Sequence, residues 1–93
     1  MKVPAEFEWD DAKAATNLAK HKVPFPFAAR VFLDPNVVVQ STFRPGDGES
    51  RCKAIGRIET KLYVVVFVMR GQVCRLISAR RTNTKEDRNY GNP

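Results

Sequence analysis

The sequence predicts a single small α+β domain over residues 1–93. We expect an antiparallel β-sheet of four to five strands, with two N-terminal helices on one face and a short C-terminal helix. Three observations support this class: helical periodicity up to residue 36, strand-like runs after it, and short turn sequences between those runs. Since hairpin-type links join antiparallel neighbours, the second half should form a meander against which the helices pack.

The first half of the chain predicts a strand and an amphipathic helix. Phe7–Trp9 alternates apolar and polar residues, which is typical of a strand with one buried face. Asp10 or Asp11 then offers an N-cap carboxylate to a helix that runs to about His21. This helix has an apolar arc, able to lie close on a sheet, and a polar arc opposite it. The apolar arc is Ala12, Ala15, Leu18 and Ala19, and the polar arc is Lys13, Thr16, Asn17 and Lys20, with His21 at its edge.

A second helix is expected from about Pro24 to Phe32. Prolines are tolerated in the first turn of a helix, and Asp34-Pro35-Asn36 ends this one as a turn. Apolar residues recur at helical spacing, so we interpret the Phe-rich stripe as core. The stripe consists of Phe25, Ala28, Ala29 and Phe32.

The second half predicts four strands and a last short helix. Val37 opens the first of these strands, and residues 51–57 form the next. Leu62–Met69 is apolar on both faces, as a central strand covered on both sides would be. Val73–Ala79 forms the last strand, and Thr84 and Asp87 stand in a near capping-box relation at the start of the final helix.

The charge of the chain is unevenly distributed. The net charge is +6, yet residues 1–47 hold as many acidic as basic side chains, so the whole excess lies in residues 48–93. A one-sided basic surface indicates a polyanion or an acidic protein as the partner. The alternative at this point is a soluble surface that simply carries extra Lys and Arg.

Several classes of function lack their sequence signals. The first ten residues contain no apolar run typical of a signal peptide, and the longest apolar run is too short to span a bilayer. We therefore expect a cytoplasmic protein without a membrane partner. Cys52, Cys74 and His21 do not have the spacing of metal ligands, so no metal or cofactor is predicted, and both cysteines should act as small buried hydrophobes.

Basic residues recur at strand period in the second half. Up to six cations should therefore converge on the open side of the sheet. Like charges at that density repel one another unless anions such as phosphates or carboxylates occupy the surface. Only four carboxylates are available in this half, too few for full internal pairing. The six are Arg51, Lys53, Arg57, Arg75, Arg80 and Arg81.

With these residues in view, the sequence resembles the BrnT family of type II toxins. The matching residues extend from Phe7 to Tyr90, and it is their order along the chain that is specific. They are Phe7-Glu8-Trp9-Asp10, Lys13, Asn17, Lys20-His21, Phe25, Ala28, Val31-Phe32, Asp34-Pro35, Glu49, Arg51, Ile55-Gly56, residues 62–66, residues 75–80, Glu86 and Tyr90.

The resemblance implies a ribonuclease toxin of RelE-like fold that blocks translation by cutting mRNA, on or off the ribosome. It further implies neutralisation by a BrnA-type antitoxin that carries a ribbon-helix-helix DNA-binding domain. Toxin and antitoxin would form a heterotetramer that represses its own operon.

Metal-free RNA cleavage needs cations for the crowded phosphorane, a base and an acid. We expect Arg57 and Arg80 nearest the scissile phosphate, with Arg51 and Arg75 in support. Lys53, Arg81 and Tyr90 are expected to bind RNA, as is Arg75. Tyr90 could do so by stacking on a base, or it could instead cap the last helix.

The proton-transfer groups are less well defined by the sequence. Glu49 is the best carboxylate candidate for the base, although it could equally position Arg51 through an ion pair. His21 has a pKa suited to acid–base work, but a histidine at a helix C-terminus can also serve structure alone.

Two other functions fit the same basic surface. One is a non-catalytic module that binds RNA or DNA. The other is a protein-interaction domain whose basic face receives an acidic segment of a partner.

Overall fold

The computed structural model of the protein describes residues 3–42 and 50–90. These residues form an α+β domain with one five-stranded sheet and three α-helices, as predicted in outline. The elements in chain order are β1 (Glu6–Glu8), α1 (Asp11–His21), α2 (Phe25–Ala28), the 3-10 helix η1 (Ala29–Leu33), β2 (Val38–Ser41), β3 (Cys52–Ile58), β4 (Lys61–Arg70), β5 (Val73–Arg81) and α3 (Thr84–Asn89).

The sheet is mixed, and the prediction of a purely antiparallel sheet is wrong. Its strand order is β1-β5-β4-β3-β2, and strands β2 to β5 form the predicted antiparallel meander, with β4 central. β1 pairs with β5 in parallel, from Glu6 opposite Val73 to Glu8 opposite Arg75. Hairpin signals report only local pairing, so a three-residue strand that pairs with the far end of the chain leaves no trace in them.

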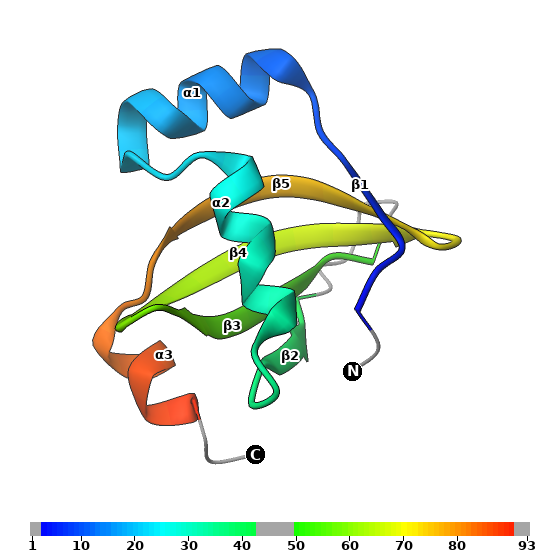
Figure 1. The fold of residues 1–93 in the computed structure, drawn as a ribbon. Coiled ribbons are helices and arrows are strands. Elements are labelled where there is room, and N and C mark those ends of the chain that lie inside the picture. Colours follow the sequence, from blue (N-terminus) through cyan, green and yellow to red (C-terminus); the bar gives the residue numbers. More distant parts are fainter. Residues whose placement is uncertain (1–2, 43–49, 91–93) are drawn as a thin grey trace.

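One face of the sheet, here called the first face, is covered by α2 and η1 (Figure 1). The predicted single helix is divided at Ala29, where the α-helix tightens into a 3-10 helix. Phe25, Ala28 and Phe32 of its apolar stripe are buried as predicted and Ala29 partly so, and the Phe32 ring packs edge-on against Phe67 of β4 at 5.1 Å. Gly56 permits this close packing, because a Cβ there would lie 2.8 Å from the Cβ of Val31.

Helix α1 begins and ends as expected. The Asp10 side chain accepts a hydrogen bond from the Lys13 amide at 3.0 Å, and Lys22 closes the helix in the left-handed region. However, α1 lies along the β5 edge of the sheet, while α2 and η1 cross the first face (Figure 1).

The orientation of α1 about its own axis differs from the predicted one, because the residues turned to the protein are Ala14 and Asn17. Asn17, from the polar arc, is buried, whereas Leu18, from the apolar arc, is 46% exposed. The Asn17 amide accepts a hydrogen bond from the Ala79 N–H at 3.0 Å and donates to the carbonyls of Ala79 (2.9 Å) and Val23 (3.0 Å). It therefore satisfies backbone groups at the β5 edge as a neighbouring strand would, and this requirement outweighs the burial of small apolar residues.

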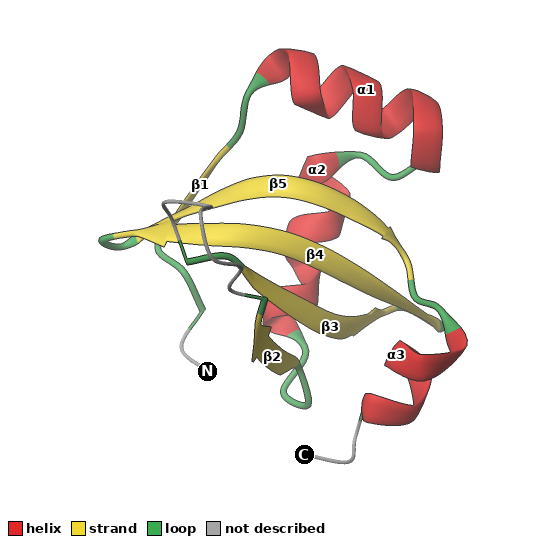
Figure 2. Ribbon diagram, turned by 180° about the vertical axis from the view of Figure 1, so that it is seen from behind, coloured by secondary structure: helices red, strands yellow, loops and turns green. Residues whose placement is uncertain are grey.

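The opposite face, here called the second face, carries α3 at one end (Figure 2). This helix begins one residue earlier than the predicted cap implies, since Asn83 and Glu86 form the capping box.

The two cysteines are free thiols, and Cys74 is fully buried. Burial, together with nearby Cys52, raises the pKa of Cys74 to about 12. Among the described helices, none has the length and apolar character needed to cross a membrane.

Candidate functional site

Strand register decides which cations share the second face. Lys53 lies opposite Val66, which lies opposite Ser78, and Arg80 lies opposite Val64. Residues directly opposite in a sheet project from the same face, so these side chains belong together. The remaining second-face cations are Arg57, opposite Leu62, and Arg75, opposite Val68.

A buried carboxylate organises the end of this face that α3 covers. Glu86 of α3 is only 1% exposed and accepts two parallel hydrogen bonds from the Arg80 guanidinium, both of 2.9 Å. Lys53 Nζ donates to the same carboxylate at 3.1 Å, and so does the backbone N–H of Asn83 at 2.9 Å. Because Lys53 and Arg80 come from strands on either side of β4, the carboxylate lies above the central strand. We call Lys53, Arg80 and Glu86 the Glu86 cluster.

The protonation of Glu86 follows from its partners. Burial alone would raise the pKa of its carboxyl, but the hydrogen bonds from Arg80, the Asn83 backbone N–H and Lys53 outweigh burial and lower the pKa from 4.5 to about 2. Glu86 is therefore ionised at neutral pH, and so weak a base is suited to holding cations in place rather than to accepting a proton.

The Arg80 side chain retains a surface for a ligand. Although both terminal nitrogens bind Glu86, 38% of the side chain is exposed, compared with 2% of Glu86. A guanidinium whose orientation is already fixed can bind phosphate oxygens at a small entropic cost.

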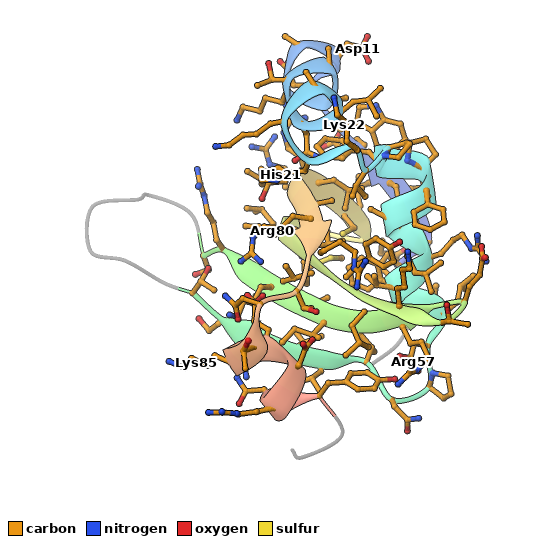
Figure 3. All side chains as sticks on the ribbon, turned by 90° about the vertical axis from the view of Figure 1, so that its left-hand side faces the viewer. Asp11, His21, Lys22, Arg57, Arg80 and Lys85 are labelled. Carbon is orange, nitrogen blue, oxygen red and sulfur yellow. The ribbon has the colours of Figure 1, made fainter. Side chains whose placement is uncertain are left out.

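Arg57 lies in a second cluster, at the other end of α3. Its guanidinium stacks on the Tyr90 ring, 5.5 Å from the centroid, and its backbone N–H donates to Asp34 Oδ2 at 2.7 Å. The Tyr90 hydroxyl donates to the same oxygen. Partial burial and this hydrogen bond raise the pKa of Tyr90, whereas the hydrogen bonds that Asp34 receives outweigh its burial and lower the pKa of Asp34. Figure 3 shows Arg57 and Arg80 well separated, so the two guanidinium groups do not meet around a single phosphate as expected.

The other predicted cations are spread around the sheet, and the expected convergence of six does not occur. Arg75 forms an ion pair of 3.5 Å with Glu8 of β1. Arg81 lies on the first face, where its guanidinium is 5.5 Å from the centroid of Tyr63, because adjacent strand residues point to opposite faces. Arg51 is exposed just before β3, and Glu49 lies outside the described residues.

His21 is brought to the edge of the same region. It lies at the C-terminal end of α1, above Arg80 in Figure 3, and lines a groove that also contains Ser78 of β5. Its imidazole is partly exposed and has no hydrogen-bond or ion-pair partner within residues 3–42 and 50–90.

Two residues that organise the site were not predicted. Glu86 stands three residues after Asn83, so the capping-box pattern could have indicated it if Asn83 rather than Thr84 had been taken as the cap. Asp34 was interpreted only as a turn residue, and no local pattern predicts its contact with Tyr90, which is 56 residues away in the sequence.

Within the part of the chain that the structure describes, no group of three or more His, Cys, Asp or Glu residues could hold a metal ion. What the described residues do assemble is a set of fixed guanidinium and ammonium groups, suited to bind an anion.

Comparison with known families identifies the kind of protein that carries this surface. A model of the ribonuclease toxin BrnT of type II toxin–antitoxin systems matches residues 9–86, more than four fifths of the chain. The chain belongs to the BrnT family. A search among curated proteins finds no match. The matched range of this BrnT protein includes the whole Glu86 cluster and His21, and it ends at Glu86 itself. As a type II toxin family, BrnT implies an antitoxin partner.

Proposed function

We propose that this BrnT protein is a metal-independent endoribonuclease that inhibits translation by cutting mRNA, with Arg80 at the scissile phosphate. The observation that carries the proposal is the Glu86 cluster. A buried carboxylate fixes the Arg80 fork while leaving more than a third of that side chain exposed. The exposed part of this fixed guanidinium is accessible to phosphate oxygens, which its planar fork matches.

The chemistry uses the substrate's own nucleophile. A base removes the proton of a 2′-hydroxyl, and the 2′-oxygen attacks the adjacent phosphorus. The bond to the 5′-oxygen then breaks, an acid protonates that oxygen, and the products end in a 2′,3′-cyclic phosphate and a 5′-hydroxyl. Negative charge accumulates on the phosphorane, where a preorganised guanidinium stabilises it.

Each predicted residue has a place in this proposal. Arg80 and Lys53 bind the scissile phosphate, and Arg57, stacked on Tyr90 at the far end of α3, binds a neighbouring one. His21 is our candidate for one proton transfer, since it lies at the edge of the face without a described partner, and Glu49 is the candidate for the other. Arg51, Arg75 and Arg81 add to the positive potential around the RNA.

The proposed partner is a BrnA-type antitoxin with a ribbon-helix-helix DNA-binding domain, assembled with the toxin as a heterotetramer in the cytoplasm. A RelE-like arrangement of sheet and helices belongs to the same proposal. The basic half of the chain supports the antitoxin partner, since an antitoxin with an acidic segment could cover the surface that RNA would use.

A cleavage assay tests the proposed activity. Purified protein is incubated with a defined 5′-labelled RNA in the presence of excess EDTA, and the new ends are analysed. We expect fragments that end in a cyclic phosphate, at a rate unaffected by EDTA. Binding without cleavage would indicate the non-catalytic RNA-binding alternative, and cleavage abolished by EDTA would overturn metal independence.

A further inference from the structure

We propose that the groove between α1 and β5 is a second RNA-binding subsite, which holds the sugar–phosphate backbone flanking the cleavage point. The inference deepens the proposed function, and it rests on that function for the nature of the ligand. The groove has a volume of about 330 Å³. The residues of α1 that line it are Ala12, Lys13, Thr16, Asn17, Lys20 and His21, and those of β5 are Ile77 and Ser78.

The groove results from an interruption at the edge of the sheet. β1 pairs only with Val73–Arg75, and the next edge contact is the Asn17 amide on Ala79. Between these points the β4–β5 register shifts at a bulge opposite Val66 and Phe67. Residues 76–78 of β5 thus lack the edge strand that flanks residues 73–75, and α1 lies alongside them. A bulge at a sheet edge commonly redirects side chains toward a functional site.

The orientation of α1 points to a ligand. Its polar arc lines the groove together with Ala12, while Leu18, the largest apolar residue of the helix, is exposed and Ala14 packs against the core. A helix in a small domain normally buries its apolar arc, so a helix that buries Asn17 and exposes Leu18 departs from the local pattern. Contradictions of this kind concentrate at functional sites, where stability is given up for another requirement.

The charges in the groove are unmatched. Lys13 and Lys20 are exposed, seven residues apart on one side of α1, with Thr16 between them. Neither ammonium group has an ion-pair partner among the described residues, and the groove lining contains no carboxylate. By contrast, the cations of β3 and β5 at Lys53, Arg75 and Arg80 are all paired. Two turns of helix separate the lysines by about 10 Å, enough for more than one phosphate of a strand.

The groove is continuous with the proposed catalytic surface. Ser78 lines it, and Arg80 follows two residues later on the same face of β5. Figure 3 shows His21, at the end of the groove, next to Arg80 in the view. A single strand lying across Lys13 and Lys20 would therefore lead its next phosphates past His21 to the Glu86 cluster. Hydroxyl groups at Thr16 and Ser78 can donate hydrogen bonds to phosphate oxygens, and the continuity with the proposed catalytic surface favours RNA over an acidic peptide.

The test compares two variants that lose the same charge. Lys13→Ala/Lys20→Ala removes two positive charges from the groove, whereas Lys61→Glu changes the charge by the same two units at the start of β4. All three lysines are exposed, so the variants should keep the wild-type melting temperature. Binding of a single-stranded RNA of about 12 nucleotides and of poly-L-glutamate is measured over a range of salt concentrations.

We expect the groove variant to lose RNA affinity about tenfold near 0.1 M salt. The slope of log binding constant against log salt concentration should be shallower by roughly one to one and a half. Lys61→Glu should keep the wild-type slope and stay within about twofold in affinity. A dinucleotide, too short to reach the groove, should be cut equally well by wild type and groove variant, and the longer RNA more slowly by the variant.

The outcomes separate this inference from the proposed function. If wild type cuts RNA and the groove variant binds and cuts the long RNA as well as wild type does, the groove is not an RNA subsite. If the groove variant loses poly-L-glutamate binding but keeps RNA binding, the groove takes an acidic protein segment and the inference is overturned. If RNA binding falls as expected but wild type cuts no RNA, the subsite stands and the proposed function fails.

Discussion

The protein has two cationic regions that are built in opposite ways. In the Glu86 cluster, Arg80 and Lys53 are hydrogen-bonded to a buried carboxylate. In the groove between α1 and β5, the side chains of Lys13 and Lys20 have no partner among the described residues. Paired cations contribute to folding and have fixed orientations, whereas unpaired cations contribute little to folding and are available to an external anion.

This difference separates the expected effects of mutation. A change in the Glu86 cluster should alter stability and activity together, because the same bonds hold α3 on the sheet and orient Arg80. A change in the groove should weaken the binding of long RNA, and therefore slow its cleavage, without altering stability.

The largest expected effect comes from Glu86→Ala. Removing the carboxylate leaves Arg80 and Lys53 near one another without their counter-charge, and the expected loss of unfolding free energy is about 3–5 kcal/mol. Urea denaturation measures it. The control is Glu59→Ala, whose partner Arg30 is exposed, and it should change stability by less than about 1 kcal/mol. Equal effects from the two substitutions would show that the Glu86 cluster does not stabilise the fold.

Acid pH should remove the same contribution reversibly. The pKa of Glu86 is lowered from 4.5 to about 2 in the folded protein, so its stabilising contribution is complete above pH 4.5 and is lost as the pH falls toward 2. The shift corresponds to roughly 3 kcal/mol at neutral pH. Unfolding measured at a series of pH values should show this loss in wild type and a flatter profile in Glu86→Gln, and identical profiles would contradict the assignment.

Much of the fold could be predicted from the sequence, because the signals concerned are local. Asp10 as a helix cap, the stripe containing Phe25 and Phe32, and the doubly covered strand around Val65 all follow from nearest neighbours. The parallel pairing of β1 and the burial of Asn17 could not be predicted, since each depends on backbone groups of β5 that lie more than 60 residues away.

The candidate site was predictable in composition rather than in arrangement. Strand alternation correctly brings Lys53 and Arg57 to one face, but it cannot indicate that α3 lies between Arg80 and Arg57. The prediction that Arg81 joins the other cations is wrong. Its neighbour Arg80 projects from the second face, so Arg81 must project from the first.

A smaller effect on stability is expected from Tyr90→Phe. The change removes the hydroxyl that donates to Asp34 but keeps the ring on which Arg57 stacks, so we expect a loss of about 1–2 kcal/mol. The pKa of Asp34 should also rise toward its ordinary value, which NMR titration of the carboxyl can follow. No change in either quantity would show that this end of α3 is not held by the hydrogen bond.

The smallest effect on stability is expected from Lys13→Ala/Lys20→Ala. Because neither side chain has a partner among the described residues, the free energy of unfolding should stay within about 0.5 kcal/mol of wild type. Calorimetry measures the difference. A loss of 2 kcal/mol or more would mean that these lysines support the fold, and the contrast with the Glu86 cluster would disappear.

The central claim is that Arg80 acts on the scissile phosphate while Glu86 holds it in place. Single-turnover cleavage of RNA by Arg80→Lys, with the melting temperature measured on the same sample, tests this claim most directly. Lysine keeps the charge beside Glu86 but loses the two-pronged geometry. We predict a stability loss of only about 1 kcal/mol and a cleavage rate lower by roughly a hundredfold or more. Wild-type cleavage by the folded Arg80→Lys protein would contradict the claim.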